Sequence, residues 1–361
     1  MNKSRYPNHG SEYEVGEIRI GIDSPGVDWA KADGSQISRH SPLGEKLRGA
    51  GYFVWATQTS QFGASTINSV AYGNGLWVAV GDGGTLRTST DAVTWVTQTS
   101  TFGTSIINAV AYANGLWVAT GNGGTIRTST NGTTWVTRTA NLGVLGGTCV
   151  AYGNGLWVVG GASGALRTSP DGTTWTTQTS QFGTNSVQAV AYGNGLWVAG
   201  GAVGTLRTST NGTTWVTQTS TFEASFISAI TYANGLWVVG GQTSKLRTST
   251  DAITWVTQDP KLTGIQSPTV YSITYNDGLW ALSSDSQAFN HGYLRTSTDA
   301  VTWVTQNPNL KLSSINTVAY ANGVWVLAGN NGALRTYNMG GSTVVLPDIS
   351  VNHSLNAWIK K

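Results

Sequence analysis

Apolar and polar residues alternate in short stretches from residue 52 to residue 337, and Gly, Asn and Asp separate one stretch from the next. Alternation with a period of two predicts β-strands. No apolar period of 3.6 residues, which would indicate amphipathic helices, is visible in this region. The pattern therefore predicts an all-β fold of many short strands joined by tight turns.

The pattern is itself repeated, and two tryptophan series mark the repeats. The Trp of GLW, or of its variants, recurs at Trp77, Trp117, Trp157, Trp197, Trp237, Trp280 and Trp325. The Trp of TTW-like sequences recurs at Trp55, Trp95, Trp135, Trp175, Trp215, Trp255 and Trp303. The early repeats are 40 residues long, and a β-rich period near 40 is typical of a four-stranded propeller blade. The two series predict a seven-bladed β-propeller.

The second repeat shows how one blade is built. Its first strand is expected at Ile106–Tyr112, and the step Asn114-Gly115 supplies the positive φ angles of a tight hairpin. The second strand, LWVAT, has apolar residues on both parities, which is typical of a strand packed on both faces. Two further strands, TIRTS and TTWVTRT, complete the blade.

The ends of the repeat region predict how the ring closes. The last repeat has no fourth strand, whereas residues 52–59 (YFVWATQT) form a fourth-strand sequence with no blade before it. We expect this strand to complete blade seven and to cover a sheet edge that would otherwise invite aggregation. The predicted domains are residues 1–51, the propeller at 52–337, and residues 338–361.

The turn Ser169–Trp175 (SPDGTTW), with its relatives STDAVTW and STNGTTW, resembles the Asp-box of sialidase-like and photosystem-assembly-factor-like propellers. The usual Asp-box has one more residue. Asn replaces Asp in two copies, which a turn-capping hydrogen bond tolerates and a charge-dependent role does not. We therefore expect this residue to cap its own turn.

The flanks of the propeller carry a different set of motifs. Gly16-Glu17-Ile18, Trp29–Ser35, Ser38-Arg39 and Pro42-Leu43 precede the propeller, and Gly340–Val351 and Ala357–Lys361 follow it. In this order they resemble the tail-collar-type module near the tips of bacteriophage tail fibres. The resemblance implies one small module into which the propeller is inserted. It further implies a virion location, other phage tail proteins as partners, and a homotrimer.

Composition narrows the classes of partner. The net charge is +3 and no basic block exists, so nucleic-acid binding is not expected. No apolar run near 18 residues predicts a membrane span. No secretory signal is visible at the start, which predicts synthesis in the host cytoplasm. Cys149 is the single cysteine, and the four histidines share no ligand spacing, so we expect neither a disulfide nor a metal site, and no cofactor.

The inventory for catalysis is small, and we expect a binding protein rather than an enzyme. Within the propeller, Glu223 is the one Glu and His291 the one His. Asp259, Asp277 and Asp285 cluster late in the chain, and each also suits an ordinary loop. A virion-associated glycan hydrolase or lyase on the same scaffold stays open as the alternative.

The arginine of the LRTS sequence recurs in all seven repeats, at Arg87, Arg127, Arg167, Arg207, Arg247, Arg295 and Arg335. A ring of cations could hold an acidic polysaccharide. The favoured interpretation is structural, with each guanidinium satisfying carbonyls between adjacent blades. The tryptophans are likewise expected in the core, with the indole N–H bonded to a neighbouring strand.

The connections between strands differ in how much they vary. The turns after the first and third strands scarcely change, whereas those after the second and fourth strands do, and the latter two emerge on one face of a propeller. Loops on a rigid scaffold often carry binding, although drift alone would also vary them. The longest such loop is expected at Ser283–Gly292, near the connection 258–269. We predict receptor binding through Asp285, Gln287, Phe289, Asn290, His291, Tyr293, Lys261 and Gln266.

The predicted function is therefore recognition of a host surface by a virion tail-tip or tail-fibre protein. The receptor is a glycan or a protein, since aromatic rings and amides suit both. A purely structural tail component is the further alternative.

Overall fold

The computed structural model describes residues 18–21, 29–31, 36–38, 55–140, 142–143, 146–260, 268–285, 292–306, 314–338, 343–345 and 356–360. The chain divides into two compact units. One is Trp55–Asn338, and the other combines Met1–Val54 with Met339–Lys361.

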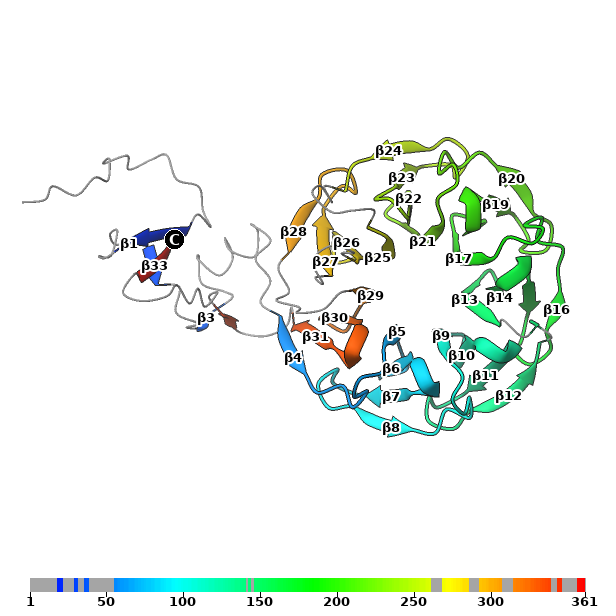
Figure 1. Cartoon of the computed structure of the whole chain (residues 1–361), viewed down its shortest axis with the longest axis horizontal. Helices are drawn as coiled ribbons and strands as arrows, with labels where there is room; N and C mark the ends of the chain where they lie inside the picture. The colour runs from blue at the N-terminus through cyan, green and yellow to red at the C-terminus, as the bar shows by residue number, and fades with distance from the viewer. Residues whose placement is uncertain are drawn as a thin grey trace, which may run out of the picture. The chain divides into compact units, whose positions relative to one another are not determined.

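Trp55–Asn338 is a seven-bladed β-propeller, as the repeat predicts. Each blade is a four-stranded antiparallel sheet whose first strand lies innermost and whose fourth strand lies at the circumference (Figure 1). Blades one to three consist of β5 (Ile67–Gly73), β6 (Leu76–Gly81), β7 (Leu86–Ser89), β8 (Val96–Gln98), β9 (Ile107–Ala113), β10 (Leu116–Gly121), β11 (Thr125–Ser129), β12 (Val136–Thr139), β13 (Gly147–Gly153), β14 (Leu156–Gly161), β15 (Leu166–Ser169) and β16 (Thr176–Thr177). Blades four to six consist of β17 (Val187–Gly193), β18 (Leu196–Gly201), β19 (Leu206–Ser209), β20 (Val216–Gln218), β21 (Ile227–Ala233), β22 (Leu236–Gly241), β23 (Leu246–Ser249), β24 (Val256–Gln258), β25 (Val270–Asn276), β26 (Leu279–Ser284), β27 (Tyr293–Ser297) and β28 (Val304–Gln306).

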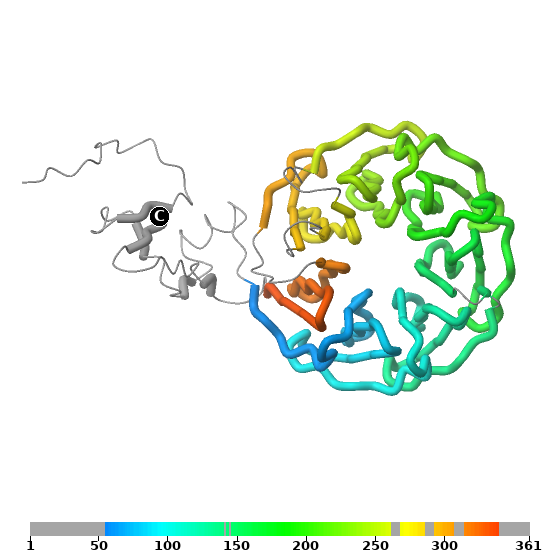
Figure 2. Tube along the Cα trace, viewed as in Figure 1, coloured from blue at the N-terminus to red at the C-terminus, as the bar shows by residue number. Residues whose placement is uncertain are grey.

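Blade seven closes the ring with a strand from the other end of the propeller. It contains β29 (Ile315–Ala321), β30 (Val324–Gly329), β31 (Leu334–Asn338) and, at its outer edge, β4 (Ala56–Gln58). Thr57 pairs with Arg335, and the Gln58 amide donates to the Thr336 hydroxyl at 2.7 Å. Figure 2 shows the start of the propeller chain lying beside its end. The predicted closure is confirmed.

The blades meet through apolar side chains of their second strands, which are buried on both faces as expected. One cluster joins Val78, Val80 and Leu86 of blade one to Ile107 and Trp117 of blade two. An equivalent cluster joins blade seven to blade one, so the closing interface is packed like the others. The tryptophans of the GLW series are almost fully buried, and each lies against a tyrosine of its own blade at 4.8–5.0 Å between ring centroids.

The turns after the first and third strands form from local chemistry. Asn114 and Gly115 have φ values of 50° and 75°, the positive angles that a tight hairpin needs. In the turn after the third strand, Asp171 Oδ1 accepts hydrogen bonds from the backbone N–H groups of Thr173 and Thr174. The Asn131 side chain does the same for Thr133 and Thr134. The predicted capping role of the Asp-box residue is confirmed.

The indole of the TTW series also bonds within this turn. Trp95 Nε1 donates to the carbonyl of Ala92, three residues earlier, at 3.0 Å. The same bond forms at Trp135, Trp175, Trp215 and Trp303. The expectation that these N–H groups bond to a neighbouring strand is therefore wrong. The acceptor is instead a backbone carbonyl of the same turn, three residues earlier in the chain.

The capping carboxylates predict how stability depends on pH. Backbone N–H groups of Thr254 and Ile253 lower the pKa of Asp251 from 3.8 to about 2, and those of Thr302 and Val301 lower that of Asp299 to about 2. The pKa values of Asp91 and Asp171 are lowered as well. A carboxyl with a depressed pKa stabilises the fold above its unfolded value, and that contribution is lost as the pH falls through the folded value.

We therefore expect the propeller to lose stability between about pH 4 and pH 2. The variant Asp91→Asn, Asp171→Asn, Asp251→Asn, Asp299→Asn should lose less over this window, because natural Asn131 and Asn211 cap without a charge. Urea unfolding at each pH measures this. Asp277→Asn, in a turn after a first strand, is the control. Equal acid sensitivity of the four-fold variant and the wild type would contradict the assignment.

The second unit joins the two flanks of the chain by strand pairing. β33 (Asn356–Lys360) lies between β1 (Ile18–Gly21) and β2 (Trp29–Lys31), with Ile18 opposite Ile359 and Trp29 opposite Lys360. β3 (Gln36–Ser38) pairs with β32 (Thr343–Val345). Both sheets therefore contain strands from before and after the propeller.

Two further features bear on chemistry. The Cys149 thiol is buried, and burial raises its pKa to about 12, so it is an unreactive core group. Among the residues that the structure describes, no helix has the length and apolar character needed to cross a membrane.

Candidate functional site

A β-bulge in the first strand of every blade turns one side chain toward the centre of the ring. In blade one, Ile67 pairs with Gly81 and Ser69 with Val80, which leaves Asn68 as the extra residue. The same irregularity occurs in the other six blades. Bulges re-aim side chains and are frequent beside functional sites. The bulge residues are Asn68, Asn108, Thr148, Gln188, Ser228, Tyr271 and Asn316.

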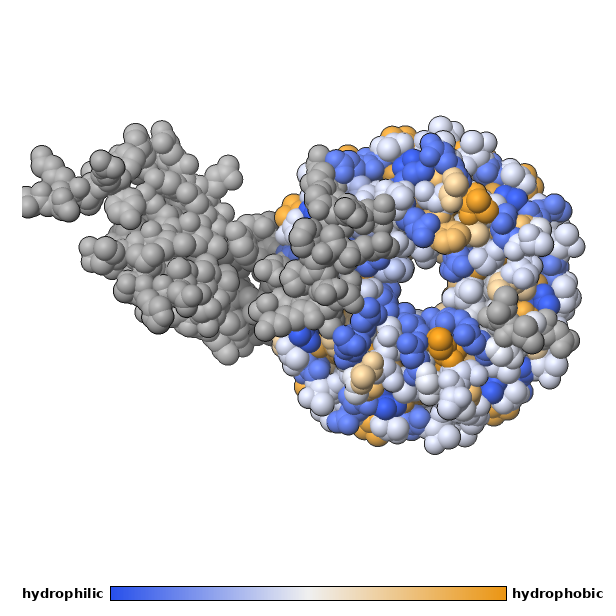
Figure 3. Space-filling model, in the orientation of Figure 1, coloured by the Kyte–Doolittle hydropathy of each residue, from blue (hydrophilic) through white to orange (hydrophobic). Residues whose placement is uncertain are grey.

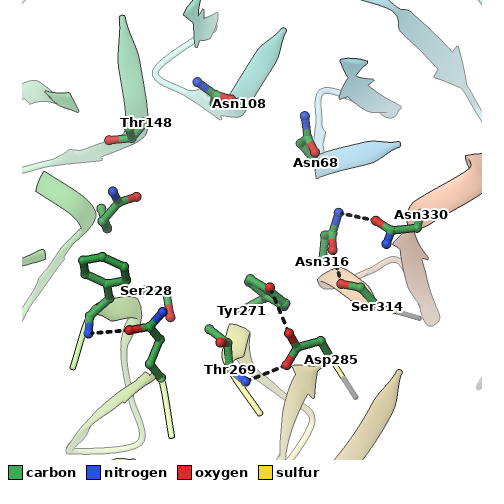
Figure 4. A pocket seen from close by; sticks show the side chains of 13 residues that line it. Asn68, Asn108, Thr148, Ser228, Thr269, Tyr271, Asp285, Ser314, Asn316 and Asn330 are labelled. Atoms are coloured by element: carbon green, nitrogen blue, oxygen red, sulfur yellow. Dashed lines mark hydrogen bonds between the residues drawn. The ribbon is translucent and has the colours of Figure 1, made fainter. Parts of the chain in front are cut away.

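These side chains line a cavity of about 910 Å³ at the mouth of the central channel. All seven blades contribute to it, together with Phe226, Gln242, Thr269, Asp285, Ser314 and Asn330. Figure 3 shows an opening at the centre of the ring, and Figure 4 shows the side chains around the mouth. The mouth lies where each first strand begins, on the face that carries the variable connections.

In five blades the bulge residue bonds the next blade. Asn68 donates to the carbonyl of Ile107 at 3.1 Å, and Asn108 to that of Gly147 at 2.8 Å. Thr148 and Ser228 bond the carbonyls of Val187 and Val270 in the same way. Asn316 donates to Ile67 at 3.2 Å and carries the series across the closure. These bonds form a ring of inter-blade staples around the mouth.

Gln188 and Tyr271 depart from this pattern. The Gln188 amide donates instead to the Ser186 hydroxyl, two residues earlier, at 2.7 Å. The Tyr271 hydroxyl donates to Asp285 Oδ2 at 3.2 Å. The ring symmetry is therefore broken in blade four and in blade six.

Asp285 anchors the departure in blade six. Its side chain is buried, and its Oδ1 accepts the backbone N–H of Thr269 at 2.6 Å (Figure 4). Burial, together with the neighbouring Asp285 charge, raises the pKa of Tyr271 to about 12. The phenol is therefore protonated at neutral pH and serves as a donor rather than as a base.

In four blades the residue that opens the turn between the second and third strands accepts a hydrogen bond from the bulge residue of its own blade. In blades one and two, Asn68 donates to Asp82 and Asn108 to Asn122 at 3.0 and 3.1 Å. Blade seven repeats this geometry at 3.5 Å, and Tyr271 and Asp285 occupy the same positions in blade six. In blade five, Gln242 instead accepts the backbone N–H of Phe226.

Of the eight residues predicted to bind a receptor, the structure describes two. Asp285 lies at the channel mouth. Tyr293 begins β27, is half-buried, and packs against the core cluster of blades five and six. The remaining six, Gln287, Phe289, Asn290, His291, Lys261 and Gln266, lie outside the described residues. The expected loop bounds are wrong at one end, because Ser283 and Ser284 still pair in β26 with Leu294 and Tyr293.

The arginine series has the structural role that was favoured. In five blades the guanidinium donates to a carbonyl of the connection that enters the blade, as Arg87 does to Gln61 at 2.7 Å. Arg127 also lies over the Phe102 ring at 4.6 Å. In these five blades the guanidinium therefore ties the entering connection to the blade, as the structural interpretation expects.

The structure separates two of the candidate carboxylates. Asp277 precedes β26 and Asp285 follows it, and a strand of this length spans roughly 20 Å. A carboxylate pair for glycoside hydrolysis lies about 5–10 Å apart, so these two residues cannot act together. Glu223 is highly exposed and pairs with Lys245 at 3.0 Å. Within the described ranges, no group of His, Cys, Asp and Glu is suited to hold a metal ion.

Sequence reasoning missed the bulge residues, Phe226 and Gln242. One signal could have found most of them. The second position of each first strand carries a side chain with a hydrogen-bonding group in all seven repeats, and five residue types occupy it: Asn, Thr, Gln, Ser and Tyr. A position buried in the core of every blade would be expected to keep one apolar residue type in all repeats.

No known sequence family matches this chain, and no curated protein does. Solved structures match its fold. YCF48 bound to D1 peptide is 15% identical with a TM-score of 0.64, over 80% of this chain and 96% of that one. The WD40 β-propeller domain of Doa1 is 15% identical with a TM-score of 0.61, over 81% and 98%. Virginiamycin B lyase from Staphylococcus aureus with quinupristin is 10% identical with a TM-score of 0.68, over 79% and 99%.

These similarities establish the β-propeller and nothing finer, because a propeller hosts many unrelated functions. One of the three is a lyase, so the fold by itself decides neither for nor against catalysis. None of the three is a bacteriophage tail protein.

Proposed function

We propose that this chain is a bacteriophage tail-tip or tail-fibre protein whose propeller recognises the surface of the host cell. The observation that carries the binding role is the broken symmetry of the channel mouth. Inter-blade hydrogen bonds around a ring need only one residue type, yet blades five and six carry Phe226 and Tyr271 at positions where no other blade has an aromatic side chain.

The tail location rests on the flanks. Their motifs resemble a tail-collar module, and strands from both flanks pair with each other. A module assembled in this way can join the tail while the inserted propeller remains a separate unit. The partners are then other tail proteins at the flanks and a host receptor at the propeller, and the trimer of tail fibres is the expected assembly.

Replacing residues 284–293 by the sequence of Gly121–Thr125 tests the binding face. The two segments span equivalent gaps, because Ser283 pairs with Leu294 as Thr120 pairs with Ile126. We expect a normal unfolding temperature. Binding of the labelled full chain to a panel of bacterial cells should fall at least about tenfold, because few contacts carry most binding energy.

The matched control is Asn74→Asp, in a turn on the opposite face, because blade six carries Asp277 at this position with a similar φ. Undiminished cell binding by the loop variant would place the receptor site elsewhere.

Electron microscopy with an antibody against the propeller tests the tail location. If the antibody labels no phage tail, the proposed tail location is wrong. If the chain binds no cell, the proposed recognition of the host surface is wrong. Shortening of a surface glycan on incubation would select the hydrolase or lyase instead.

A further inference from the structure

We propose that the channel mouth binds a non-acidic glycan, whose sugars are neutral or carry amino groups, against Phe226 and Tyr271 in blades five and six. This proposal rests on the proposed function and specifies the receptor class for it.

Two aromatic side chains are exposed in a cavity that is otherwise polar. Phe226 is 41% exposed and Tyr271 is 37% exposed, and both line the mouth. At the position of Phe226 the other blades carry Thr66, Ile106, Gly146, Ser186, Thr269 and Ser314. Leaving an aromatic ring in water forgoes the gain of burying it. The apolar face of a sugar ring would cover such a surface.

The polar groups around these rings suit sugar hydroxyls. Gln242, Ser228 and Thr269 line this wall with one amide and two hydroxyls, whereas both oxygens of the buried Asp285 already accept hydrogen bonds from Thr269 and Tyr271. Amides and hydroxyls can both donate and accept, as sugar hydroxyls do. The cavity, at about 910 Å³, has the size of a small-molecule site. A protein receptor would instead need a wide and flatter contact.

Charge decides which glycan fits. Asp285 is the one charged side chain among the described residues that line the mouth. A second carboxylate, Asp82, accepts a hydrogen bond from the lining residue Asn68. No arginine is among the described residues that line the mouth, and Arg87, Arg127 and Arg207 donate to the entering connections instead. Because the one charge among these lining residues is negative, we expect the mouth to disfavour uronate, sialate and sulfate groups and to favour amino groups.

Tyr271→Asn is the main test, because it installs the pair that blade one forms naturally between Asn68 and Asp82. The new amide can also staple the carbonyl of Ile315, as Asn68 staples Ile107. The fold should therefore be retained. Phe226→Thr is a second variant, with the residue of blade one at that position. Val256→Thr, on the outer circumference, is the control, since blade three has Thr176 there.

The probes are neutral oligosaccharides, chitosan oligomers, and uronate-, sialate- or sulfate-bearing oligosaccharides, measured on the full chain. We expect binding from the first two groups only. Each mouth variant should weaken it at least about tenfold, and the control should leave it unchanged. Preferred binding of acidic probes, or undiminished binding by both mouth variants, would overturn the proposal.

Cell binding separates this proposal from the proposed function. If periodate-treated cells still bind the chain, and both mouth variants bind cells normally, the receptor is a protein and only the glycan proposal fails. If the chain binds oligosaccharides through the mouth but no cell, only the host-recognition proposal fails.

Discussion

Deletion of residues 52–59 should convert the propeller into an aggregating protein. The deletion removes β4 and leaves β31 as an unpaired edge of blade seven. Ser60, whose hydroxyl donates to the Gly332 carbonyl, would lose its covalent link to β4. An exposed edge strand pairs readily with other chains. Size-exclusion chromatography should show loss of monomeric or defined oligomeric protein.

A rescue variant separates the loss of the strand from the loss of the linker. In the deletion variant, Tyr337 and Asn338 are replaced by the sequence of Ser169–Thr179, which supplies a turn and a fourth strand in blade order. This strand can pair with β31 as β16 pairs with β15, so solubility should return. A deletion variant that is soluble and fully stable without the rescue would show that β4 is not needed for closure.

Removal of residues 339–361 should disable the flank unit and leave the propeller intact. The truncation takes away β33, the strand between β1 and β2, and β32, the partner of β3. We expect the segment before Trp55 to become readily cut by protease. The unfolding temperature of the propeller should not change, because all its strands lie within Trp55–Asn338.

The reciprocal variant joins residue 54 to residue 339 through a short Gly/Ser linker and omits the propeller. It should retain a β-type circular dichroism spectrum, since both flank sheets keep all their strands. The chain that lacks residues 339–361 should also be missing from assembled phage particles, because the proposed tail location depends on an intact flank unit. If the segment before Trp55 resists protease equally well in the truncated chain and in the full chain, the two flanks do not form one folded unit.

The difference between the predicted and the observed site has a physical cause. The loop around Asp285 was found because its length breaks the repeat, and length is visible in a sequence. Tyr271 and Phe226 were missed because they lie at the start of a strand. There the alternation of apolar and polar residues does not show toward which face of the sheet a side chain points. The bulge, which leaves residues such as Asn68 out of the ladder, sets that direction.

The sequence by itself determined the blade count, the four-stranded blade, the capped turns and the closing strand. Each of these depends on contacts between residues close in the repeat, or on counting repeats, as with Asp171 and its own turn. Only the tertiary structure decided which side chains share the channel mouth. Tyr271 and Asn68 are about two hundred residues apart in the sequence, and ring closure together with the bulges brings such residues to one cavity.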